Sequence, residues 1–194
     1  MAGAREDGGI SAWMMGYPDT PGRRWLHKAP VTLWRLGLGP VLGRVFILLT
    51  ARGRKSGQPR RTAVARWEVN GQLYGWCPYG ERAQWYRNVV ADPRVTLQTR
   101  GGARSAVVAR VADDVELTRL YRVVEETDAA GLAWYLGRVG IGDDPADLVA
   151  KKERVHFLRF DPAPDSGLPG QRADLAWVWG ALALLAGWWC RRRA

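Results

Sequence analysis

Residues 60–77 read RRTAVARWEVNGQLYGWC, and they give the clearest indication of the fold. Two runs rich in β-branched and aromatic residues flank Asn70-Gly71, a dipeptide that tolerates positive φ at both central positions of a type I′ turn. The stretch therefore predicts an antiparallel hairpin with strands over 60–69 and 72–77.

Other elements can be placed outward from this hairpin. Strands are predicted over 45–50, 94–99, 104–111 and 155–160, and helices over 30–38, 83–91, 113–127 and 131–139. Antiparallel hairpins with helices between them are typical of an α+β protein, whereas a doubly wound parallel sheet needs regular crossover helices. We expect a small antiparallel β-barrel with peripheral helices.

The composition excludes several classes of protein. The chain has 194 residues, of which 47% are hydrophobic and 25% charged, so it predicts one folded domain rather than a disordered chain. Two cysteines and two histidines without ligand spacing predict neither a zinc site nor a disulfide framework. The N-terminal residues lack the apolar core of a signal peptide, which predicts a cytoplasmic protein.

The positive charge is concentrated in one part of the chain. The formal net charge is +10, and no Asp or Glu occurs between Thr20 and Trp67. Such a local excess attracts polyanions. Nucleic acid, anionic lipid and a phosphorylated cofactor are all compatible with the charge alone.

The chain divides into four predicted regions: a flexible N-terminal segment (1–22), the main domain (23–161), a Pro/Gly linker (162–173) and a Trp-rich hydrophobic tail (174–194). No charge occurs from Leu175 to Cys190, and three arginines follow. At about 1.5 Å per residue, a helix of this length is shorter than the roughly 30 Å core of a bilayer. The tail therefore predicts an interfacial anchor on an anionic membrane, with a helix docked on the barrel as the alternative.

One basic loop contains most of the residues that could bind an anion. Residues 52–61 read RGRKSGQPRR. Glycines let backbone N–H groups approach an oxyanion, Ser56 can donate a hydrogen bond, and Arg54 or Arg60 can bind bidentately. The pattern indicates an anion cradle, although it is no Walker loop, because Arg54 stands where that motif needs glycine.

Two motifs in this region resemble a known family. Residues 48–60, LLTARGRKSGQPR, are followed by Pro78-Tyr79-Gly80-Glu81 and by Trp85-Tyr86-Arg87-Asn88. Together they are similar to the deazaflavin-dependent nitroreductase and quinone reductase family, whose members use reduced coenzyme F(420). The resemblance implies a split β-barrel related to FMN-binding barrels, with the cofactor in a groove.

The resemblance also implies roles for single residues. Arg54, Lys55, Ser56, Gly57 and Arg60 would hold the phosphate and the acidic glutamyl arm of the cofactor. Pro78, Tyr79 and Gly80 would face the deazaflavin ring, with Trp85 and Asn88 bracing that wall. Trp134 and Tyr135 would face the substrate. Tyr79, Tyr86 and Tyr135 are candidates for stabilising or protonating a reduced acceptor.

The expected function is hydride transfer from reduced F(420) to a lipophilic acceptor such as a membrane quinone, with adventitious reduction of nitroaromatics. The tail would hold the enzyme at the inner face of the cell membrane, and a homodimer is possible. An FMN-dependent oxidoreductase of the same barrel class is one alternative. A basic protein without catalysis is the other, binding lipid or stacking nucleic-acid bases on Trp25, Trp34 and Trp67.

Overall fold

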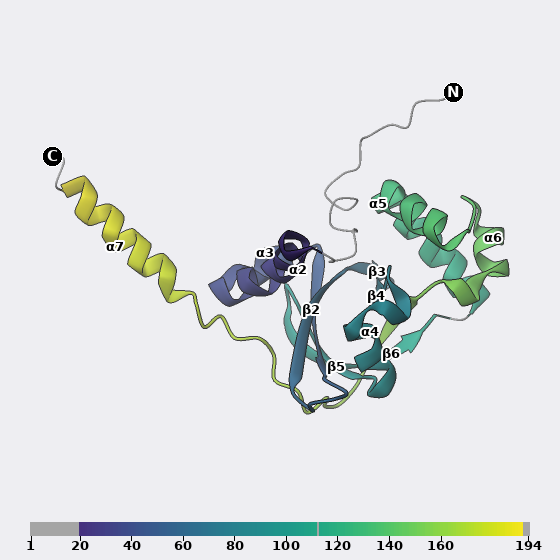
Figure 1. The fold of residues 1–194 in the computed structure, drawn as a ribbon, viewed down its shortest axis with the longest axis horizontal. Coiled ribbons are helices and arrows are strands. Elements are labelled where there is room, and N and C mark those ends of the chain that lie inside the picture. The colour runs from purple at the N-terminus through teal and green to yellow at the C-terminus, as the bar shows by residue number, and fades with distance from the viewer. Residues whose placement is uncertain (1–19, 112, 192–194) are drawn as a thin grey trace, which may run out of the picture.

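The computed structural model describes residues 20–111 and 113–191, so most of the expected N-terminal segment and of the terminal arginine cluster lies outside the described residues. Its centre is a seven-stranded antiparallel sheet that curls into a half-barrel (Figure 1). In sheet order the strands are β2 (Pro59–Ala65), β1 (Phe46–Arg52), β5 (Arg94–Thr99), β6 (Gly102–Arg110), β7 (Phe157–Pro162), β4 (Gln72–Trp76) and β3 (Trp67–Val69). The predicted α+β split barrel is confirmed.

The decisive hairpin differs from the prediction in one respect. The run over 60–69 is not one strand, because β2 ends at Ala65 and β3 begins at Trp67. The two strands lie at opposite edges of the sheet, so the single residue between them brings these edges together. At the turn, φ is 52° for Asn70 and 80° for Gly71, which confirms the type I′ turn.

The remaining elements are helices, and all but the last of them lie around the half-barrel (Figure 1). They are α2 (Pro21–Leu33), η1 (Trp34–Leu38), α3 (Gly39–Leu42), η2 (Gly80–Arg82), α4 (Gln84–Ala91), α5 (Asp114–Val139), α6 (Pro145–Ala150), η3 (Lys152–Arg154) and α7 (Trp177–Arg191). The helix predicted over 30–38 starts earlier, at Pro21. The two helices predicted over 113–139 are joined as α5, with a kink at Asp128, whose carboxylate accepts a hydrogen bond from the Gly131 N–H.

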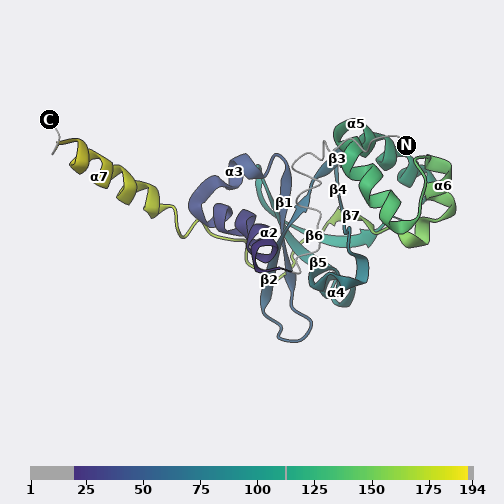
Figure 2. The same cartoon turned by 45° about the horizontal axis from the view of Figure 1, so that its top comes forward.

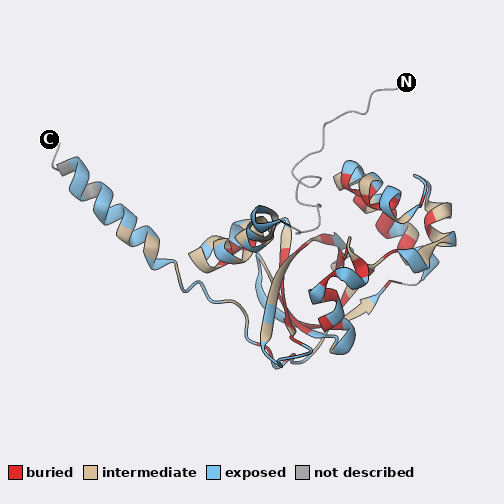
Figure 3. Ribbon diagram, in the orientation of Figure 1, coloured by how far each residue is buried: buried red, intermediate tan, exposed pale blue. Residues whose placement is uncertain are grey.

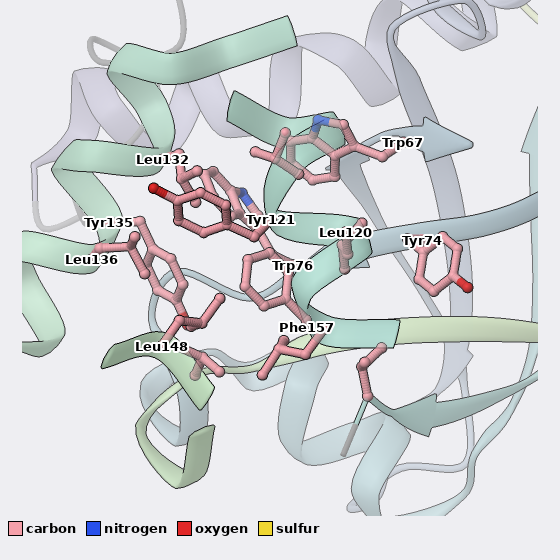
Figure 4. Packing of buried hydrophobic residues seen from close by; sticks show 14 of the residues in the cluster. Trp67, Tyr74, Trp76, Leu120, Tyr121, Leu132, Tyr135, Leu136, Leu148 and Phe157 are labelled. Carbon is pink, nitrogen blue, oxygen red and sulfur yellow. The ribbon is translucent and has the colours of Figure 1, made fainter. Parts of the chain in front are cut away.

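Two hydrophobic clusters hold the fold together. One lies inside the half-barrel and includes Ile47, Leu49 and Leu97. The other joins α5 and α6 to the sheet, and Figure 4 shows Trp76 between the helix residues and Trp67. The ring centroids of Trp76 and Tyr135 are 4.9 Å apart. Strand β4 therefore holds α5 beside the barrel. In Figure 3 the buried residues lie on the faces of the sheet and helices that pack together.

A polar row lies on the outer face of the sheet. Four neighbouring strands contribute one residue each, paired in register: Arg61 on β2, Thr50 on β1, Thr96 on β5 and Ser105 on β6. The segment after β7 covers this row: the Thr96 hydroxyl donates to the Leu168 carbonyl (2.7 Å), and the Ser166 N–H donates to the Ser105 hydroxyl (3.0 Å). The chain over 163–174 is thus held against the barrel, although it contains no helix or strand.

Helix α7 stands away from the barrel beyond α3 (Figures 1 and 2). Its root is fixed, because Arg35 forms an ion pair with Asp174 (2.8 Å) and the Trp179 indole donates to the Leu36 carbonyl (2.8 Å). Further along, Leu184 and Leu185 are 77% and 61% exposed. Within the described residues, no helix is both long enough and apolar enough to cross a membrane.

Candidate active-site groove

A groove of about 1460 Å³ opens at the closing edge of the half-barrel. Strand β2 forms its floor, with α2 on one side and the loop after β4, helix α4 and the kink of α5 around it. The lining residues are 27–28, 44–46, 53–56, 60–68, 76, 78–79, 82–85, 88, 123 and 127–128. The groove therefore joins the two sequence motifs that lie about thirty residues apart.

The basic loop at one end of the groove is a closed turn. The Gly53 N–H donates to the Gln58 carbonyl (2.9 Å), and the Gly57 N–H donates to the Gly53 carbonyl (2.7 Å). Gly57 has a φ of 69°, and a Cβ on Gly53 would lie 3.0 Å from the Gln58 oxygen. Both positions therefore favour glycine. Gly57 shapes the turn without lining the groove.

Arg54 attaches the loop to α4. Its backbone N–H and its Nη1 donate to the Asn88 Oδ1 at 3.2 and 3.1 Å, and its Nη2 donates to the Gln84 Oε1 at 3.0 Å. Asn88 is buried, so its side-chain oxygen is a fixed acceptor. Asn88 thus positions the loop, and much of the Arg54 guanidinium is already engaged.

Arg52 of the loop forms an ion pair with Asp92 (3.4 Å), whereas Lys55 and Arg60 have no counterion among the described residues. Among the described residues, no carboxylate lies within ion-pair distance of Lys55 or Arg60, and both side chains are exposed. Arg60 Nη2 donates a long hydrogen bond to the Ser56 hydroxyl (3.4 Å). An anion entering this end of the groove would meet two unneutralised charges and one hydroxyl.

Pro78, Tyr79 and Trp85 form the opposite wall. Tyr79 packs edge-on against His27 of α2, with ring centroids 6.3 Å apart. Gly80 lies behind this wall with a φ of 48°, and a Cβ there would come within 2.7 Å of the His156 ring. The wall therefore depends on close contact between Gly80 and His156, and Gly80 does not line the groove.

The groups behind the wall stay uncharged at neutral pH. Burial, reinforced by the positive charge of Arg110, lowers the pKa of His156. Burial raises the pKa of the Cys77 thiol to about 12 and also raises that of Tyr86. Tyr86 packs perpendicular to His156, with ring centroids 4.9 Å apart, and does not line the groove.

Two residues expected to face the substrate lie elsewhere. Tyr135 is fully buried, and its hydroxyl accepts a hydrogen bond from the His156 N–H (2.9 Å). Trp134 is half-buried beneath the Arg138 guanidinium, 4.9 Å from the ring centroid. Neither lines the groove, because α5 presents this part to the core. Thr127 and Asp128, at the kink, line it instead.

Several groove residues were missing from the sequence prediction. They include the cations Lys28, Arg44 and Arg66 and the apolar Trp67, Trp76 and Val123. The acid-free segment pointed to the cations, and the hairpin contained both tryptophans. The sequence did not show that the two edges of the sheet meet at Arg66, between β2 and β3. This closure brings both strands of the predicted hairpin to one groove.

A split half-barrel with a basic loop and an aromatic wall facing one groove defines a small cofactor-binding enzyme. A sequence model of the F(420)H(2)-dependent quinone reductase family matches residues 37–139, just over half of the chain. The chain belongs to this family. It is an oxidoreductase, and the family implies coenzyme F(420) rather than FMN as its cofactor.

Several solved structures are similar to this chain. An F(420)-H(2) dependent reductase is 20% identical with a TM-score of 0.47, covering 61% of this chain and 95% of its own. A domain-swapped dimer is 20% identical with a TM-score of 0.49 (73% and 100% covered). A conserved hypothetical protein from Mycobacterium tuberculosis is 20% identical with a TM-score of 0.41 (65% and 82% covered). The family assignment depends on the sequence match and not on these structures.

The residues of the groove fit this cofactor. Its phosphate and carboxylates need several cations in one place, and the basic loop supplies Lys55 and Arg60 without counterions. Its ring system needs a flat apolar surface, and Trp67, Trp76 and Trp85 line the remainder of the groove. The two chemistries lie within one continuous cavity.

Proposed function

We propose that this protein transfers a hydride from reduced F(420) to a lipophilic quinone, with both molecules in the groove described above. The observation that carries the proposal is that one groove is lined both by the unpaired cations Lys55 and Arg60 and by three tryptophans. The family supports the reaction class, and the proposal adds that the acceptor is a lipophilic quinone. Reduction of nitroaromatics would be adventitious use of the same groove.

The basic loop would hold the anionic part of the cofactor. Lys55, Ser56 and Arg60 can bind the phosphate and the nearest carboxylates, while Gly57 keeps the loop closed. When bound, reduced F(420) supplies the hydride. The wall of Pro78 and Tyr79 would then fix the ring plane, with Trp85 bracing it and Asn88 holding the loop in place.

Charge that develops on the acceptor oxygen needs a stabilising group. Tyr79 is the tyrosine of the three candidates that lines the groove, so its hydroxyl is proposed as the hydrogen-bond donor to that oxygen. Arg44 and Lys28, at the α2 side of the groove, add positive charge. Tyr86 and Tyr135 are buried and are assigned supporting roles in the wall and core.

We further propose that α7 lies on the anionic cytoplasmic face of the cell membrane. Its large apolar side chains are exposed around the helix rather than packed on the barrel, and three arginines (191–193) follow the apolar run. An apolar helix with terminal cations suits an interface of headgroups and acyl chains. This location would bring the groove near a lipophilic quinone. A homodimer remains a prediction, which sedimentation analysis would test.

Titration of the purified protein with F(420), followed by fluorescence, tests the cofactor assignment. Lys55→Ala and Arg60→Ala should each weaken binding by about 1.5–3 kcal/mol, the range for a charge-assisted hydrogen bond. Arg104→Ala is the matched control, because Arg104 is an exposed arginine on β6 outside the groove. Unchanged affinity in both loop variants would contradict the proposal.

A further inference from the structure

His27 brings an imidazole to the groove. The chain has two histidines: His156 packs behind the wall, whereas His27 lines the cavity from α2. His27 is half-buried, and its ring centroid lies 6.3 Å from that of Tyr79. Helix α2 ends before residues 37–139, which match the family model. His27 therefore belongs to a part of this chain that the family match does not include.

Reduction of a quinone to a hydroquinone needs a proton as well as a hydride. The hydride forms one O–H bond, and its electron pair leaves the other quinone oxygen as a phenolate. A second proton, bound at that phenolate, completes the hydroquinone, and the proton lost on oxidation of the cofactor goes to water. The quinone thus gains two electrons and two protons. A side chain that contacts the phenolate oxygen can deliver the second proton.

The ordinary pKa values of side chains point to His27 as this donor. Tyrosine, lysine and arginine keep their protons at neutral pH, and carboxylates have none to give. Histidine is the side chain that both gives and takes up a proton there. Charged groups that line the same groove include Lys28, Arg44, Arg60, Arg61, Arg82 and Asp128. They provide charge, whereas His27 provides an exchangeable proton.

We propose that His27 is the general acid of this reductase, and that its imidazolium protonates the acceptor oxygen to which Tyr79 donates a hydrogen bond. The imidazolium N–H bond breaks as the second O–H bond of the hydroquinone forms. Water then returns a proton to the imidazole, which is not sealed from solvent. Lys28 and Arg44 stabilise the phenolate before it is protonated. This inference is based on the proposed function, in which the acceptor is a quinone.

Steady-state reduction of menadione by reduced F(420) tests the proton donor. His27→Ala should lower kcat at least about a hundredfold, the lower end of the range for general acid catalysis, with little change in KM. Added imidazole should restore much of the lost rate in this variant and leave the wild-type rate unchanged. His27→Gln should lose the same rate without rescue, because its side chain fills the space. Thr32→Ala is the matched control, since Thr32 is exposed on α2 outside the groove.

Binding of a stable phenolate measures the same contact without turnover. The probe is 2,4-dinitrophenolate, which mimics the charge of the hydroquinone anion, and equilibrium dialysis with oxidised F(420) present gives its affinity. At about pH 6, where histidine side chains ordinarily carry a proton, His27→Gln should bind the probe about tenfold more weakly than the wild type. The affinities for neutral menadione and for F(420) should be unchanged. A purely structural role of His27 would alter all three affinities.

The outcomes separate this inference from the proposed function. Equal kcat values in the wild type and His27→Ala would overturn the general acid and leave hydride transfer to a quinone intact. A loss of kcat without imidazole rescue and with unchanged phenolate affinity would also overturn it, because His27 would then act only through the packing of α2. Failure of the wild type to reduce menadione would overturn the proposed function, and the general acid with it. Circular dichroism of each variant establishes that the fold is retained.

Discussion

At the scale of single residues, His156 shows how a group outside the groove supports its wall. The imidazole packs against Tyr86 and under Gly80, and burial lowers its pKa below the usual 6.5. The unfolded chain therefore takes up the proton first as the pH falls. The free energy of unfolding should decrease as the pH drops below about 6.5 and level off below the folded pKa.

Urea unfolding between pH 7.5 and pH 5 measures this effect. His156→Gln should show a smaller loss of stability over that range than the wild type, because the variant lacks the titrating imidazole. An NMR titration of the His156 ring in the folded protein should give a midpoint below the usual histidine value. Identical pH profiles for wild type and variant would contradict the account.

The residues of the basic loop could be selected from the sequence because their chemistry is local. Lys55 and Ser56 fall within one short turn whose glycines are visible in the sequence, Arg60 follows at the start of β2, and all three line the groove. The partners of that turn are not local. Arg54 meets Asn88 through packing of α4 on the sheet, and no pattern around either residue reports that contact.

At the scale of elements, the tether between the basic loop and α4 should control the order of the loop. Asn88→Ala removes the buried acceptor of two Arg54 hydrogen bonds, so it should cost about 1–3 kcal/mol of unfolding free energy. It should also accelerate hydrogen exchange of the Arg54 amide. Asn88→Asp is the matched variant, since its carboxylate keeps an acceptor at Oδ1. An unchanged Arg54 exchange rate in Asn88→Ala would contradict the tether.

The elements themselves were largely predictable, because each depends on a local signal. The Asn70-Gly71 turn and the apolar runs beside it determine the hairpin, and the break in α5 occurs at Asp128, between the two predicted helices. The division at Arg66 was not predictable. It depends on the pairing of β1 with β5 and of β4 with β7, and these pairings join residues far apart in the chain.

At the scale of the whole molecule, α7 is an apolar helix that stands apart from the catalytic barrel (Figure 1). The root is held at Asp174 and Trp179, whereas Leu184 and Leu185 are exposed. Leaving such side chains in water is unfavourable, and each buried leucine gains roughly 1.5–3 kcal/mol. The exposed part of the helix is therefore the part that a membrane would stabilise.

Cosedimentation with vesicles that contain anionic phosphatidylglycerol tests this division. Leu184→Asp combined with Leu185→Asp should weaken vesicle binding at least about tenfold, equivalent to 1.4 kcal/mol. It should leave the melting temperature and F(420) affinity unchanged, since both side chains are exposed and distant from the groove. Val115→Asp is the matched control, because Val115 is an exposed apolar residue on α5 and an acid suits a helix N-terminus. If the double variant bound vesicles like the wild type, α7 would not be the membrane contact.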